Sequence, residues 1–177
     1  MSFTKENAFI IIGAVVVTLL QLVVAPYVKV FNAMPNFMAA YAIVVAVVRP
    51  RSTRTVILSF AMGLLYNLFV GGVVGSLSVV LILVATGASL SMRTLANDTH
   101  FQPLAIMAVS MVVVELAYLV VLLASGLGLG FGQALLFRAL PCAVYDVVVG
   151  AILYMAMSRL ATSNERLQPN HGPTLLR

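Results

Sequence analysis

The sequence predicts an all-α integral membrane protein, folded as a bundle of six transmembrane helices. Hydrophobic residues make up 62% of the 177 residues and charged residues only 8%, whereas about a quarter of the residues of a soluble domain are charged. The mean hydropathy is +1.10. Most of the chain therefore lies in the bilayer, which leaves no room for a separate soluble enzyme domain.

Six apolar runs mark the expected helices. In chain order they are Ala8–Val24, Pro35–Val48, Thr55–Val70, Val73–Met92, Pro103–Ala124 and Phe131–Leu160. A helix that crosses the hydrocarbon core of about 30 Å needs about 20 residues, so the first, fourth and fifth runs qualify and the sixth is longer than needed. The second run reaches only about 20 Å, and the sequence leaves open whether it spans the membrane fully or in part.

The runs and their ends divide the chain into a membrane domain and a tail. Residues 1–160 form the polytopic transmembrane domain, and its first run is interpreted as a retained helix because no small-residue cleavage site follows it. Residues 161–177 are polar and contain two prolines and a glycine. This segment is predicted to be a cytoplasmic, disordered tail.

The cations predict the topology of the helices. Eight of the ten lie at one set of alternating ends: Lys5, Arg49, Arg51, Arg54, Arg93, Arg159, Arg166 and Arg177. The opposite set holds only Lys29, and Arg138 lies within an apolar run. Cytoplasmic connections are rich in Lys and Arg, so both termini are predicted to be cytoplasmic. The turn from Arg49 to Arg54 is interpreted as a topology anchor, with contact to anionic lipid or to a cytoplasmic partner as the alternative.

Several classes of function are disfavoured. The net charge of +5 is spread thinly along the chain, which disfavours nucleic-acid binding. Cys142 is the only cysteine, and the two histidines lie far apart in polar segments. We therefore expect no disulfide within the chain, no metal site and no cofactor. The chain carries no phosphate-binding loop and no nucleophile motif, so we do not expect an enzyme.

Three ionisable residues lie inside apolar runs: Glu115, Arg138 and Asp146. Glu115 is expected about 13 Å from the outer end of its helix and Arg138 about 10 Å from the outer end of the next. At similar depths they could pair, and pairing would offset the cost of desolvating each charge. A structural pair that joins two helices is favoured over a proton or substrate relay. The sequence does not decide whether the three residues bind a ligand or only hold helices together.

Pro141 lies between Arg138 and Asp146. A proline inside a helix removes a backbone donor and can kink the helix. The freed backbone groups and Asp146 could form a polar pocket with Asn67 of the third run, either as a ligand site or, more simply, as a contact between helices.

The segment from Gly63 to Gly75 combines an amide with a cluster of glycines. Asn67 needs a partner in the membrane, because an unpaired polar group in hydrocarbon is costly. Gly71 and Gly75 match the small-xxx-small pattern that lets helices approach closely. The sequence therefore predicts a close-packed seam around Asn67.

Three segments of the chain together match the pattern of one family. One is Leu22-Val-Val-Ala-Pro26 followed by Pro35-Asn36, and another is the glycine-rich segment from Gly63 to Gly75. A third is Arg138-Ala-Leu-Pro141 with Tyr145-Asp146 and Leu153-Tyr154. In these segments the chain resembles the MreD family of bacterial rod shape-determining membrane proteins. The chain has Asn67 where the family often has Asp, and Asp146 where Asn is common. The two residues are therefore hypothesised to face one another, with the acid moved between helices.

This resemblance implies a non-enzymatic scaffold of the cell-elongation machinery for peptidoglycan, in the bacterial inner (plasma) membrane. The implied direct partner is an MreC-like single-span protein. Through it, the scaffold would act with MreB, RodA and a class B penicillin-binding protein. The resemblance also implies a fold similar to the substrate-binding subunits of energy-coupling-factor vitamin transporters. Such a transporter subunit is the rival function, and it would need an outward-facing pocket with polar and aromatic groups.

Overall fold

The described part of the chain is entirely helical in regular structure. A computed structural model describes residues 5–29, 33–50, 53–95, 101–126 and 130–166. Its elements are α1 (Lys5–Val23), α2 (Phe37–Val48), α3 (Thr53–Phe69), α4 (Ser76–Thr94), α5 (Gln102–Ala124), α6 (Phe131–Ala134), the π-helical turn η1 (Leu135–Ala139) and α7 (Leu140–Arg166). The last three follow one another without a break, so the chain folds into six helical bodies at the positions of the six predicted runs.

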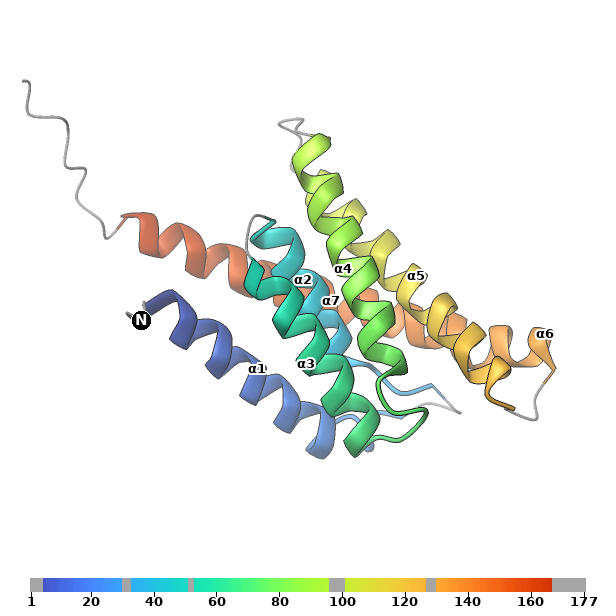
Figure 1. Cartoon of the computed structure of the whole chain (residues 1–177). Helices are drawn as coiled ribbons and strands as arrows, with labels where there is room; N and C mark the ends of the chain where they lie inside the picture. The colour runs from blue at the N-terminus through green and yellow to red at the C-terminus, as the bar shows by residue number, and fades with distance from the viewer. Residues whose placement is uncertain (1–4, 30–32, 51–52, 96–100, 127–129, 167–177) are drawn as a thin grey trace, which may run out of the picture.

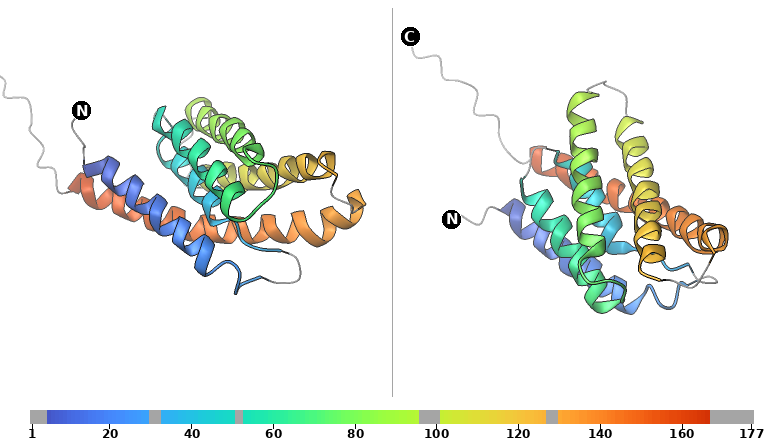
Figure 2. Two further views of the ribbon diagram at one scale, coloured as in Figure 1. Left: turned by 60° about the horizontal axis from the view of Figure 1, so that its bottom comes forward. Right: turned by 45° about the vertical axis from the view of Figure 1, so that its right-hand side comes forward.

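The short helix α2 lies at the centre of the bundle (Figure 1). It packs against α1, α3, α4, α5 and α7, and the ten consecutive residues from Met38 to Val47 are all buried. The absence of charged residues and the four alanines along α2 account for this position, because small side chains let neighbouring helices approach. The two views in Figure 2 show the other helices around it and the long α7 running past it.

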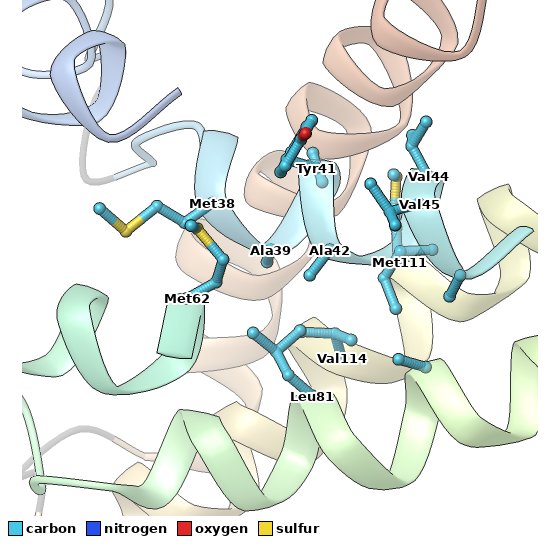
Figure 3. Close-up of a cluster of buried hydrophobic side chains, with 14 of the residues drawn as sticks. Met38, Ala39, Tyr41, Ala42, Val44, Val45, Met62, Leu81, Met111 and Val114 are labelled. Carbon is cyan, nitrogen blue, oxygen red and sulfur yellow. The ribbon is translucent and has the colours of Figure 1, made fainter. Parts of the chain in front are cut away.

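The packed core is built on α2. Met62 of α3, Leu81 of α4, and Met111 and Val114 of α5 are buried in one cluster with the α2 side chains (Figure 3). Tyr41 of α2 turns toward α1, where its hydroxyl donates to the Ile10 carbonyl at 2.9 Å. The core therefore joins all four of these helices to α2.

Helix α2 is shorter than a membrane span. Its 12 residues extend about 18 Å, against about 30 Å of hydrocarbon. Within the described residues, three helical stretches are long and apolar enough to cross a membrane: Ser76–Thr94, Gln102–Ala124 and Phe131–Arg159. The helices α1, α2 and α3 are apolar but shorter.

The close-packed seam lies at Gly63 rather than at Gly71 and Gly75. A Cβ atom on Gly63 would lie 2.5 Å from the backbone N and Cα of Ser78, so α3 and α4 touch there. Gly71 and Gly75 instead lie in the turn between these helices, with φ of +105° and +82° and open space where a Cβ would point. The predicted packing role of these two residues was therefore wrong. They provide left-handed turn conformations that other residues rarely adopt.

The final helix changes its winding just before Pro141. The Leu140 N–H bonds the Leu135 carbonyl five residues back, and Pro141, which has no N–H to donate, follows directly after this wider turn. The predicted disturbance at Pro141 is therefore a π turn that contains Arg138.

At its C-terminal end, α7 continues to Arg166, so the prediction of disorder was wrong for residues 161–166. Residues 167–177 lie outside the described residues.

Gly63→Ala is expected to destabilise the protein by about 1–3 kcal/mol, as is typical of overpacking. The added methyl group would meet the backbone of Ser78, which can yield only if α3 and α4 move apart. The thermal midpoint of the full chain in mild detergent, followed by size-exclusion chromatography after heating, measures the effect.

Gly87→Ala is the matched control for this substitution. Gly87 also lies inside a membrane helix, but a Cβ atom there would meet no atom within 4 Å. We expect the midpoint to be unchanged or slightly raised. Equal losses of stability in the two variants would contradict the proposed contact between α3 and α4.

Candidate functional site

The start of α2 lies inside the protein and is held by polar side chains. The Gln21 amide of α1 donates to the Pro35 carbonyl at 3.1 Å and accepts from the Phe37 N–H at 2.7 Å. Asn36 is the N-cap of α2, and its side-chain oxygen accepts from the Ala39 N–H at 3.0 Å. Gln21 and Asn36 are almost fully buried. Hydrogen bonds at the Pro35-Asn36 pair therefore hold the start of α2 against α1.

Asp146 joins α7 to the start of α2 by a hydrogen bond. Its Oδ1 atom accepts from the Asn36 N–H at 2.7 Å, and its side chain is only 1% exposed. Asp146 thus links two segments that lie 110 residues apart in the chain.

Asp146 also contacts the other buried acid. The Asp146 and Glu115 carboxyl groups form a side-chain hydrogen bond. Because an ionised carboxylate can only accept, this bond requires a proton on one of the two groups. Arg138 lies close enough to interact electrostatically with Glu115.

The side chains of Glu115 and Arg138 line the same cavity, as their similar depths led us to expect. Their pairing stays a prediction, because no ion pair between them is among the contacts of the described residues. The direct hydrogen-bond partner of Glu115, however, is Asp146. Which acid or base Glu115 contacts is decided by the side of the helix on which each residue lies, and not by its depth along the helix.

Asn67 forms a second polar contact, separate from that of Asp146. Its Oδ1 atom accepts from the Leu77 N–H at 3.0 Å in the first turn of α4. Its Nδ2 group donates to the Tyr118 hydroxyl at 3.1 Å and to the Gly71 carbonyl at 3.4 Å. Asn67 therefore caps α4 and joins it to α5.

The hypothesis that Asn67 faces Asp146 is not supported. The hydrogen bonds described for Asn67 reach Gly71, Leu77 and Tyr118, whereas Asp146 bonds Asn36 and Glu115. In the part of the chain that the structure describes, the two residues share no hydrogen-bond partner. The difference from the family pattern at these positions is therefore not explained by an acid that moves between contacting helices.

A cavity of about 520 Å³ lies beside these contacts. Its polar lining comes from the segment before α2, from α3, α5 and α6, and from η1: Lys29, Tyr66, Glu115, Tyr118, Gln133 and Arg138. The rings of Tyr66 and Tyr118 meet edge to face, with centroids 6.3 Å apart. Among the described residues, no group of three His, Cys, Asp or Glu side chains could hold a metal ion. The cavity can bind a polar ligand through hydrogen bonds and charge.

Four residues of the site were not predicted from the sequence: Gln21, Asn36 as a helix cap, Tyr66 and Tyr118. Gln21 carried the same signal as Asn67, because it is a lone amide in an apolar run and needs a partner. Applying that argument to every run would have identified it. The tyrosines gave no comparable signal, since tyrosine is also common at membrane surfaces.

Comparison with known proteins gives one clear match. A family model described as "rod shape-determining protein MreD" matches residues 3–163. No curated protein and no solved structure gives a significant match to the chain.

Asp146→Leu is expected to destabilise the protein by about 1–3 kcal/mol, because it leaves the buried Asn36 N–H without an acceptor. The substitution also removes the hydrogen bond to Glu115. The loss is measured as a fall in thermal midpoint, or in the denaturant midpoint, of the purified full chain.

Asp146→Asn is the matched variant. Its amide oxygen can still accept from the Asn36 N–H, and its amide nitrogen can donate to Glu115. We expect it to retain most of the stability. A loss as large as that of Asp146→Leu would show that the charge, rather than these hydrogen bonds, holds α7 to α2.

Proposed function

Because the chain belongs to the MreD family of rod shape-determining proteins, we propose that it is a non-enzymatic membrane scaffold of the cell-elongation machinery. In this proposal it binds an MreC-like single-span protein in the bacterial inner membrane. Through that partner it acts with MreB, RodA and a class B penicillin-binding protein in peptidoglycan synthesis. The observation that carries the proposal is the family match over residues 3–163.

The arrangement of the helices supports a structural role. Three helical stretches are long and apolar enough to span a membrane, and α2 is held in place by contacts with five other helices. The buried polar groups at the starts of α2 and α4 bind backbone atoms. A bundle fastened in this way presents fixed outer surfaces to a partner helix.

We further propose six membrane crossings with both termini in the cytoplasm. The cations are the support, since cytoplasmic connections are rich in Lys and Arg. The Arg93 guanidinium donates to the Pro50 carbonyl at 2.7 Å through its Nε atom. This bond brings the end of α4 to the connection between α2 and α3, so Arg49 and Arg93 lie at the same end of the bundle.

Cysteine labelling tests this topology. In a Cys142→Ala background, a cysteine at Ser125 should react with a membrane-impermeant maleimide in intact spheroplasts. A cysteine at Thr53 should react only after lysis, because it follows the opposite, cytoplasmic connection. Labelling of Thr53→Cys before lysis would contradict the proposed orientation.

A second candidate function is a substrate-binding subunit of an energy-coupling-factor vitamin transporter. The cavity lined by Tyr66, Glu115, Tyr118 and Arg138 is the observation that favours it, because a small-molecule site needs such convergent polar and aromatic groups. The family match favours the scaffold.

Affinity purification distinguishes the two candidates. The tagged full chain, extracted in mild detergent from the bacterium that encodes it, should copurify with the MreC-like protein and with RodA. An unrelated multi-pass protein with the same tag is the control. Depletion of the chain should round the cells, since rod shape would no longer be maintained. Recovery of two ATPases and a coupling membrane subunit, with rod shape retained on depletion, would overturn the scaffold.

A further inference from the structure

The polar groups around the cavity are mainly hydrogen-bond donors. Arg138 and Lys29 can only donate, and both carry a positive charge. Glu115 is the one acidic residue of the lining, and its carboxyl group is already bonded to Asp146. A ligand that fits this lining must therefore offer acceptors.

Two tyrosine hydroxyls add donors at the wall of the cavity. Tyr66 is only 7% exposed, and its hydroxyl has no hydrogen-bond partner among the described residues, although it lines the cavity. The Tyr118 hydroxyl accepts from Asn67 at 3.1 Å, which leaves its own proton free to donate. A ligand acceptor in the cavity would supply a partner for both hydroxyl protons.

The charges around the cavity leave one positive charge in excess. The lining contains two cations, Arg138 and Lys29, and one acidic residue, Glu115. A singly charged anion would therefore bring the filled site to neutrality.

The remaining lining is apolar, with Met34, Val70 and Phe137 among its members. We propose that the cavity binds a singly charged oxoanion carried on an apolar body, with the chemistry of a phosphate diester. The anionic oxygens accept from Arg138, Lys29 and the two tyrosine hydroxyls, and the apolar body lies against Phe137 and Val70. This site does not depend on the proposed scaffold function.

Native mass spectrometry of the full chain in detergent tests the site. Phosphatidylglycerol is a singly charged phosphate diester with an apolar body, and phosphatidylcholine carries the same phosphate with a cancelling positive charge. We expect one phosphatidylglycerol molecule to be retained per chain in preference to phosphatidylcholine. Arg138→Gln should weaken this retention by about tenfold or more, because it removes a charge-assisted hydrogen bond. Tyr66→Phe, which removes only a hydroxyl, should weaken it by about threefold.

Two matched substitutions outside the cavity serve as controls. Arg54→Gln removes a cation near the start of α3, and Tyr154→Phe removes a hydroxyl from α7; neither residue lines the cavity. Both variants should retain phosphatidylglycerol as the unsubstituted chain does.

Dimethyl phosphate, added as a competitor, identifies the source of the ligand: displacement of the lipid indicates a water-soluble phosphate diester, and failure to displace it indicates a membrane lipid.

Three results would overturn the proposal. One is equal retention of the two lipids by the unsubstituted chain. Another is unchanged retention in both Arg138→Gln and Tyr66→Phe when their thermal midpoints match that of the unsubstituted chain. The third is a loss in Arg54→Gln as large as that in Arg138→Gln, which would show that the lipid binds to surface cations in general.

Discussion

The rest of the structure depends on one constraint, which is that α2 begins inside the bundle. The first backbone N–H groups of a helix have no partner within the helix, and hydrocarbon offers none. Gln21 from α1, Asp146 from α7 and the cap residue Asn36 bind backbone groups at this helix start. These bonds place three helices relative to one another, and the apolar faces of α3, α4 and α5 then pack around α2.

The start of α4 follows the same principle with different residues. Gly75 occupies its N-cap position and has no side chain, so Asn67 reaches over from α3 to accept from the Leu77 N–H. In both places a polar side chain on one helix completes the backbone hydrogen bonding of another. Of the five buried amides and acids in the described residues, all but Glu115 therefore bind backbone groups at the start of a helix.

The sequence was sufficient to predict the helices and the nearness of Glu115 and Arg138. Hydropathy and charge predicted six helical segments, and the rise per residue predicted similar depths for these two residues, which line one cavity. It did not give the rotation of each helix about its axis, so the bond between Glu115 and Asp146 could not be foreseen. Gly71 and Gly75 were misread because the same spacing of glycines suits both a helix contact and a turn with positive φ.

The π turn before Pro141 has a consequence for comparing this chain with its relatives. A π turn holds one more residue than an α-helical turn, which is equivalent to a single-residue insertion in an otherwise continuous helix. Removing that residue would rotate everything before it by about 100° relative to α7. Gln133 and Phe137 would then leave the cavity, while Asp146 would stay bonded to α2. Relatives that lack the inserted residue would thus keep the architecture and present a different cavity wall.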